Sequence, residues 1–157
     1  MGAAPGQAVT VEAASPLDPE ASALLDELSA TLAGITGSSG RNSFDPADVE
    51  QEGALFVLAR DAAGRAVGCG AFRPLEPGVC EIKRMYAAPG SRGVGAAMLA
   101  YLEQAARDLG YVQAWLETRL VNTRAVRFYE RNGYARIANY GKYAGRAEAA
   151  CFAKPLD

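Results

Sequence analysis

The sequence predicts an α/β (α+β) protein with a mixed, mostly antiparallel central sheet of six to seven strands and about four helices. Segments with the two-residue apolar period of strands are interspersed with segments at helical spacing. Short glycine-containing turns join three consecutive strands in the middle of the chain, and such short connections require antiparallel pairing. The length of 157 residues is that of one ordinary domain. We therefore expect one domain over residues 1–157, with residues 1–7 as a flexible N-terminus.

The first half of the chain begins with a weakly alternating strand and continues with two helices. Asp18-Pro19 supplies an N-cap followed by proline at the first helical position, and leucines follow at helical spacing. The glycine-rich run 34–40 predicts a loop, and Asp45-Pro46 begins a second, short helix that ends before Gly53. The expected elements are a strand over 9–13, a helix over about 19–33, the short helix, and strands over 54–60, 66–74 and 79–87.

The second half alternates helices with strands. Apolar residues at helical spacing predict a helix that opens at Gly93 and ends before Gly110, a glycine at the usual C-terminal position. Asn122 caps a further helix, which Gly133 ends. The remaining expected elements are a strand over 112–118, a strand from 134 onward, and a last strand over 149–154.

The strand over 79–87 is unusually rich in charge for the middle of a sheet. The two-residue period places alternate residues on opposite faces: Glu81, Lys83 and Met85 on one, and Ile82, Arg84 and Tyr86 on the other. Buried charge is costly unless it is paired or functional. This strand is therefore the first place to expect a site.

Composition excludes several classes of function. The chain has no histidine, which excludes Ser-His-Asp and Cys-His nucleophile systems and His-ligated zinc or haem. All 16 basic residues lie beyond residue 40, together with 13 of the 18 acids, so the body is mildly basic and favours small anionic ligands over nucleic acid. The longest apolar run is about seven residues, too short to span a membrane, and no leader pattern is visible. We expect a cytoplasmic protein without bound metal.

The three cysteines, Cys69, Cys80 and Cys151, are odd in number and form no C-x-x-C pair. Neither a disulfide framework nor a zinc ribbon is indicated. We expect reduced, mostly buried thiols.

A strand, a glycine-bearing turn and a helix start follow one another at residues 79–97, which is the arrangement of an anion site. Free N–H groups converge at the helix N-terminus, and Arg92 adds a guanidinium suited to phosphate oxygens. Gly93-Val94-Gly95 also begins a dinucleotide-binding pattern, with Glu117 at a suitable distance for a ribose contact. That alternative is disfavoured because the third glycine position is Met98 and only 40 residues follow Glu117. A plain glycine turn that opens a core helix is the other alternative.

Two motifs in the right order resemble those of the GCN5-related N-acetyltransferase (GNAT) superfamily. The acyl-CoA signature, Gln/Arg-x-x-Gly-x-Gly/Ala, is matched by Arg92, Gly95 and Ala97. The later family pattern is matched at Asn122, Ala125, Phe128, Tyr129, Gly133 and Tyr134. The resemblance covers about residues 79–135 and implies a sheet splayed between strands 4 and 5. It implies an acetyl-CoA-dependent N-acetyltransferase acting on a small-molecule or peptide amine, without nucleic acid or membrane partners. It leaves a homodimer open.

The resemblance also implies which residues hold the cosubstrate. The pantetheine arm would lie along the strand at Met85, Tyr86 and Ala87, and Asn122 would hydrogen-bond it. The pyrophosphate would rest on N–H groups of the turn, formed by Arg92, Gly93, Val94, Gly95, Ala96 and Ala97. Tyr129 would contact the thioester end of the cosubstrate.

The same resemblance assigns the chemistry to Tyr129 and Glu81. Tyr129 would protonate the departing thiolate, and Glu81, directly or through a water, would help deprotonate the amine. Glu117 is the second candidate base, and an ion pair with Lys83 or an arginine is the structural alternative for Glu81. A core aromatic is the corresponding alternative for Tyr129.

The acceptor is less defined than the cosubstrate. Arg119 stands where similar sequences tend to carry glycine, so it would change the mouth of the site. Candidate acceptor-pocket residues, chosen by position only, are Arg41, Phe44, Tyr140 and Tyr143. A non-catalytic acyl-CoA-binding or sensing module is the alternative function.

Overall fold

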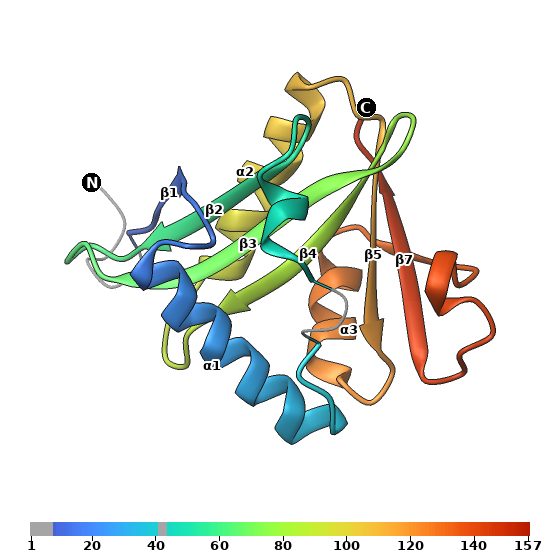
Figure 1. Ribbon diagram of the computed structural model, residues 1–157, viewed down its shortest axis with the longest axis horizontal. Helices are drawn as coiled ribbons and strands as arrows, with labels where there is room; N and C mark the ends of the chain where they lie inside the picture. Colours follow the sequence, from blue (N-terminus) through green and yellow to red (C-terminus); the bar gives the residue numbers. More distant parts are fainter. Residues whose placement is uncertain (1–7, 41–43) are drawn as a thin grey trace.

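The computed structural model describes residues 8–40 and 44–157, which form one seven-stranded sheet with helices on both faces (Figure 1). Residues 1–7, expected to be a flexible N-terminus, and Arg41 lie outside the described residues. In chain order the elements are β1 (Thr10–Ala13), α1 (Pro19–Thr36), the 3-10 helix η3 (Pro46–Val49), β2 (Leu55–Arg60), β3 (Ala66–Glu76), β4 (Val79–Ala87), α2 (Val94–Asp108), β5 (Gln113–Arg119), α3 (Thr123–Arg131), β6 (Ala135–Ile137), the 3-10 helix η4 (Gly141–Tyr143) and β7 (Ala149–Pro155).

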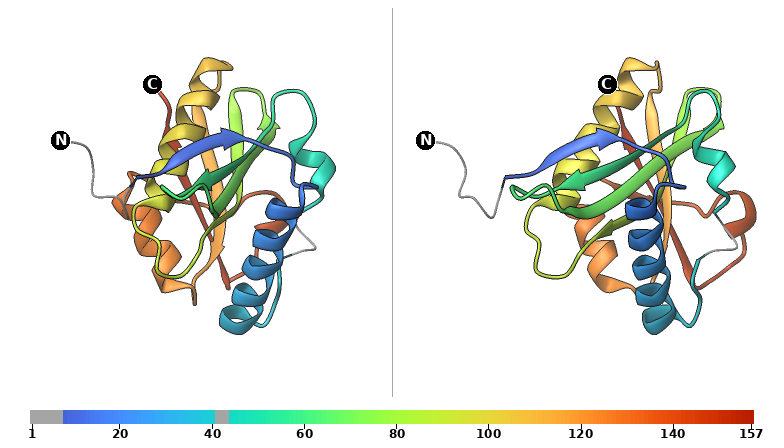
Figure 2. Two further views of the ribbon diagram at one scale, coloured as in Figure 1. Left: turned by 90° about the vertical axis from the view of Figure 1, so that its left-hand side faces the viewer. Right: turned by 60° about the vertical axis from the view of Figure 1, so that its left-hand side comes forward.

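The strands lie in the order β1-β2-β3-β4-β5-β7-β6, and the sheet separates two helical layers (Figure 2). α1 and η3 pack on one face of β2–β4, whereas α2 and α3 pack on the opposite face. All strand pairs are antiparallel except β4 with β5. The α/β prediction with a mostly antiparallel sheet is confirmed.

β4 and β5 pair over three residues and then separate. Their parallel ladder runs from Val79↔Gln113 to Glu81↔Trp115 and stops there. Beyond it β4 continues to Ala87 without a β5 partner, while β5 stays paired with β7. The predicted splay between strands 4 and 5 is confirmed, and it opens the middle of the sheet.

A β-bulge in β4 overturns the predicted division of its side chains between the two faces. β3 residues Cys69 and Ala71 pair with Tyr86 and Lys83, so Gly70 alone opposes two residues of β4. Arg84 absorbs the extra residue at φ 55°, in the left-handed region. Strict alternation is therefore wrong beyond Lys83.

The side chains after the bulge show the new arrangement. Arg84 and Tyr86 point toward α1, where they bond Ser29 and Glu27. Met85 lies on the other face, in the core beneath α2, and a Cβ at Gly70 would stand 2.4 Å from its sulfur. The bulge thus directs two polar side chains of β4 to the α1 side.

Three elements have other bounds or another type than the local sequence signals predict. α1 runs three residues further, through Gly34, and ends at Gly37 with φ 81°. β3 extends past Pro74, which is tolerated because β2 ends opposite Phe72 and leaves no partner there for a proline N–H. The second helix is a single 3-10 turn.

The three cysteines are free and buried, as predicted. Burial raises the pKa of the Cys69 and Cys80 thiols to about 12 each, and it also raises that of Cys151. In the part of the chain that the structure describes, no helix is both long and apolar enough to cross a bilayer.

Candidate active site

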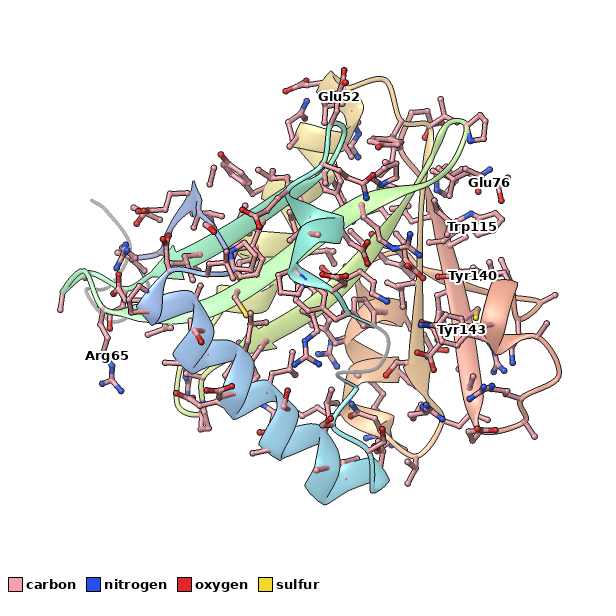
Figure 3. All side chains as sticks on the ribbon, in the orientation of Figure 1. Glu52, Arg65, Glu76, Trp115, Tyr140 and Tyr143 are labelled. Carbon is pink, nitrogen blue, oxygen red and sulfur yellow. The ribbon has the colours of Figure 1, made fainter. Side chains whose placement is uncertain are left out.

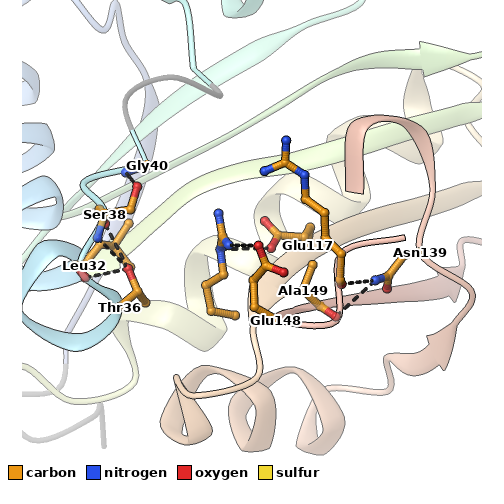
Figure 4. Close-up of polar contacts among 10 residues, drawn as sticks. Leu32, Thr36, Ser38, Gly40, Glu117, Asn139, Glu148 and Ala149 are labelled. Atoms are coloured by element: carbon orange, nitrogen blue, oxygen red, sulfur yellow. Dashed lines mark hydrogen bonds and ion pairs between the residues drawn. The ribbon is translucent and has the colours of Figure 1, made fainter. Parts of the chain in front are cut away.

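The separation of β4 and β5 opens into a cleft of about 630 Å³. Its walls come from α1 and the loop after it, β4, the start of α2, β5 and α3. In Figure 4 the cleft-lining residues Ser38 and Gly40 lie on one side of the view and Glu117, also cleft-lining, lies toward the other. Met85, Tyr86 and Ala87, the strand residues predicted to meet the cosubstrate, all line this cleft.

The N-terminus of α2 forms the end of the cleft predicted to hold phosphate. Gly93 takes a left-handed conformation (φ 70°), which glycine adopts without strain, and the first helical hydrogen bond runs from Ala97 N–H to Gly93 O at 3.0 Å. The N–H groups of residues 94–96 therefore precede the helical ladder.

Part of the predicted turn lies outside that end of the cleft. Gly93, Val94, Gly95 and Ala96 line it, whereas Arg92 and Ala97 do not. Arg92 instead borders a separate hollow of about 380 Å³.

Gly95 also satisfies a packing constraint. A Cβ there would lie 3.1 Å from the ring of Phe128 on α3. The glycine lets α2 and α3 approach each other beside the cleft.

α3 brings Asn122, Ala125 and Tyr129 to the cleft wall. Asn122 is the N-cap, as predicted, and its Oδ1 accepts from Ala125 N–H at 3.3 Å, which leaves the Nδ2 group as its donor. Tyr129 is buried, with its ring edge-on to Phe128 and Tyr134. Among the described residues its hydroxyl has no hydrogen-bond partner. Burial raises its pKa, so the phenol stays protonated.

Glu81, on β4, is 1% exposed and has both carboxylate oxygens bonded. Oε1 accepts from Arg73 Nε at 2.9 Å and Nη2 of Arg73 lies at the same distance, while Oε2 accepts from the Tyr140 hydroxyl. Lys83 Nζ lies 3.7 Å from Oε1. The ion pair considered as the structural alternative for Glu81 is therefore present.

Glu117, on β5, has a different environment. Its Oε2 is buried without a hydrogen-bond partner among the described residues, and Arg119 Nε lies 3.6 Å from that oxygen. Desolvation raises the pKa of this carboxyl, while Arg119 and Lys83 oppose the rise. Both Glu81 and Glu117 line the cleft, but only Glu117 keeps an oxygen without a hydrogen bond.

The positions expected to shape an acceptor pocket differ in where they lie. Tyr143 and Arg119 line the cleft, and Tyr140 lies behind Glu81, to which it donates; Figure 3 shows Tyr140 and Tyr143 on the same edge of the sheet. Phe44 does not line it and instead lies under the Arg84 guanidinium, 5.6 Å from ring centroid to Cζ. Arg41 is not described.

Two arginines that shape the site were missed by sequence reasoning. Arg84 donates to Leu25 O, Ser29 Oγ and Ser39 O, and so ties α1 and the following loop to β4. Arg73 neutralises Glu81. A signal for Arg73 existed, because the tight turn between β3 and β4 places it directly opposite Glu81. No sequence pattern marks the bulge that aims Arg84.

Comparison with known proteins gives the family. Residues 22–134 match the model of the acetyltransferase (GNAT) family. The chain is 30% identical over 151 residues to an IAA acetyltransferase of Azospirillum brasilense, covering 94% of this chain and 98% of that one. This chain belongs to the GNAT family of acetyltransferases. The members of this family use acetyl-CoA as cosubstrate, and the predicted resemblance is confirmed.

One solved structure agrees in fold, and a further relative agrees in sequence. A Klebsiella pneumoniae structure, described as a proposed acyl-CoA N-acyltransferase, superposes with a TM-score of 0.80 at 29% identity over 95% of this chain and 98% of its own. An N-acetyltransferase of Escherichia coli K12 without assigned function is 33% identical over 116 residues, or 66% of this chain and 68% of that one. The described residues contain no group of three or more side chains able to hold a metal ion.

Proposed function

We propose that this GNAT protein transfers the acetyl group of acetyl-CoA directly to a primary amine within a ternary complex. The observation that carries the proposal is a pair of groups in one cleft. Tyr129 and Glu117 both line the cleft. The Glu117 Oε2 is buried without a hydrogen-bond partner among the described residues, and the Tyr129 hydroxyl makes no hydrogen bond to those residues. One is a protonated acid and the other a carboxylate, which are the two groups that aminolysis of a thioester needs. We further propose that residues 1–157 act as a single domain, which the one continuous sheet supports.

The cosubstrate would occupy the gap between β4 and β5. The unpaired edge of β4 at residues 85–87 offers backbone groups to the pantetheine amides, as in strand addition. Asn122 Nδ2 offers a further donor, and the N–H groups at the start of α2 offer a phosphate site. When bound, acetyl-CoA supplies the activated acyl carbon.

Proton handling falls to Glu117 and Tyr129 in this proposal. Glu117 accepts the proton that the amine loses as its nitrogen bonds the acyl carbon. Tyr129 gives its proton to the sulfur as the carbon–sulfur bond breaks. Glu81, the first candidate from sequence, is better suited to positioning, because its charge is already neutralised and its oxygens are bonded. Direct transfer is supported by the cysteines, since none of the three thiols lines the cleft and burial keeps them protonated.

The first experiment measures thermal unfolding with acetyl-CoA and with NAD. A ligand at about 100 times its Kd stabilises the native state by roughly 2.7 kcal/mol, so acetyl-CoA should raise the Tm clearly while NAD leaves it unchanged. Release of free CoA is then followed with a panel of amines. Amine-dependent release supports the enzyme, whereas binding of acetyl-CoA without release for any amine would indicate a sensing module. A shift with NAD alone would refute the proposal.

A further inference from the structure

The cleft is lined by a mostly buried lysine, Lys83, whose ammonium receives no hydrogen-bond acceptor from the described residues. The Lys83 side chain is 8% exposed and lines the cleft. Its one ion-pair partner among the described residues, Glu81 Oε1, stands 3.7 Å away, beyond hydrogen-bond distance. That oxygen already accepts the Arg73 hydrogen bond. The three N–H donors of Lys83 therefore have no acceptor within the described part of the chain.

A mostly buried charge with few partners is costly, and because Lys83 lines the cleft, a ligand group there can complete the contacts of its ammonium. Desolvation lowers the pKa of Lys83, and Lys142 and Arg73 lower it further. Glu81 and Glu117 both act in the opposite direction, which places the two carboxylates within electrostatic reach of Lys83. An anion from the ligand would relieve the desolvated charge.

The surrounding charges argue against an acceptor that is only a cation. Arg73 and Lys83 surround Glu81, and Arg119 is shared between Glu117 (3.6 Å) and Glu148 (3.2 Å). A simple amine would have to place its positive charge among these cations. An amine that also carries an anion can direct its nitrogen to Glu117 and the anion to Lys83.

The proposal, which rests on the proposed function, names the acceptor class. We propose that the acceptor is an amino carboxylate, such as an α-amino acid, whose carboxylate binds the Lys83 ammonium while its amine faces Glu117. A monoanionic carboxylate suits this position better than a phosphate dianion, because the Glu81 carboxylate lies 3.7 Å from the same ammonium and repels added negative charge. Lys83 is thereby a substrate-binding residue, distinct from the groups that move protons.

The test compares α-amino acids with their amides, which are nearly the same size and shape but lack the negative charge. CoA release is measured with acetyl-CoA saturating for each acid and its amide. We expect the wild-type kcat/KM to favour the acid roughly tenfold to a hundredfold, the value of one charged hydrogen bond. Equal rates for acid and amide would overturn the proposal. Absence of release with every amine would instead count against the proposed function.

Two variants test whether Lys83 causes the preference for acids over amides. Lys83→Met should abolish the preference for acids by lowering kcat/KM for acids at least tenfold more than for amides, while the KM for acetyl-CoA stays the same. Lys142→Met removes a nearby exposed charge that does not line the cleft, and should change the preference less than twofold. If Lys83→Met lowered turnover of acids and amides equally, or raised the KM for acetyl-CoA, the lysine would serve the cosubstrate and the proposal would be wrong. The acid-to-amide ratio of the wild type tests it even if this variant fails to fold.

Discussion

Arg73 on β3 and Glu81 on β4 face each other across an antiparallel pair, and the guanidinium holds the buried carboxylate through Nε and Nη2, each 2.9 Å from Oε1. The Tyr140 hydroxyl bonds the other oxygen. The last parallel pair between β4 and β5 is at Glu81 and Trp115, so this cluster sits where the sheet begins to open. A satisfied charge network at that point fixes the base of the cleft.

Removing the Glu81 charge should therefore reduce the free energy of unfolding strongly and affect the rate of acetyl transfer less. Glu81→Gln leaves the Arg73 guanidinium without its anion, and we expect a loss of about 3 kcal/mol in the free energy of unfolding. Urea unfolding followed by circular dichroism measures it. Arg60→Gln, which breaks more exposed ion pairs with Glu12 and Glu20, is the matched control and should cost less. A stable Glu81→Gln protein with turnover reduced a hundredfold would return the role of base to Glu81.

Replacing Glu117 should have the opposite effects, with a large loss of rate and a gain in stability. Glu117→Gln should lower kcat about a hundredfold or more, because the amine loses its proton acceptor. The same change should raise stability at neutral pH, since it removes a desolvated charge whose pKa is raised. Rate and Tm measured on one preparation separate the two effects.

The pH dependence of this stabilisation has a definite sign. A carboxyl whose pKa is raised on folding binds more protons in the native than in the unfolded state over the interval between its ordinary and its raised pKa. The contribution of this group to wild-type stability is therefore fully present below the ordinary pKa. It is lost as the pH rises through the raised pKa of the folded protein. The gap between Glu117→Gln and wild type should be largest at neutral pH and close in acid. A wild type that is more stable than Glu117→Gln at neutral pH, with the difference vanishing in acid, would show that the carboxylate is stabilised by its neighbours.

Tyr129→Phe should separate binding from turnover. The ring keeps its contacts with Phe128 and Tyr134, and the hydroxyl has no partner among the described residues, so folding and acetyl-CoA affinity should be preserved. Loss of the acid should reduce kcat about a hundredfold. Calorimetric titration with acetyl-CoA and the rate of CoA release are the two readouts. Tyr134→Phe is an informative comparison, because its hydroxyl bonds Glu103 and its loss should reduce stability.

The order of elements, and the α2 and α3 residues that line the cleft, were predictable because they rest on local signals. Glycine positions, the Asn122 cap and apolar periods each act within a few residues, and the motif spacing placed Tyr129 and the α2 turn in one cleft. The charged residues of β4 were also enough to predict that this strand contributes to a site.

The acceptor side was less predictable because it depends on long-range geometry. Period-two reasoning could not reveal the bulge that turns Arg84 to α1, since a bulge depends on how two strands pair. The choice between Glu81 and Glu117 depended on partners distant in sequence, Arg73 and Tyr140. The sequence identified both carboxylates as candidate bases, but it could not show that Glu117 keeps an oxygen without a hydrogen-bond partner among the described residues.

Gly95 offers a test of whether packing or ligand approach requires a glycine at the start of α2. Its Cβ would meet the Phe128 ring at 3.1 Å, so Gly95→Ala sets a helix-propensity gain of about 1 kcal/mol against a close contact. In a Phe128→Leu background the contact is relieved and the alanine should stabilise by the full propensity. A double-mutant cycle should give a coupling of about 1 kcal/mol.

The rise in Tm on adding acetyl-CoA, measured for the same variants, distinguishes a packing requirement at Gly95 from a requirement for close ligand approach. If packing is the constraint, Gly95→Ala weakens acetyl-CoA binding in the wild-type background and Phe128→Leu restores it. If the backbone must approach a phosphate closely, binding stays weak in both backgrounds. Gly93→Ala is the control for conformation, because a Cβ there meets nothing within 4 Å but must adopt φ 70°, and it should cost stability whichever residue occupies position 128.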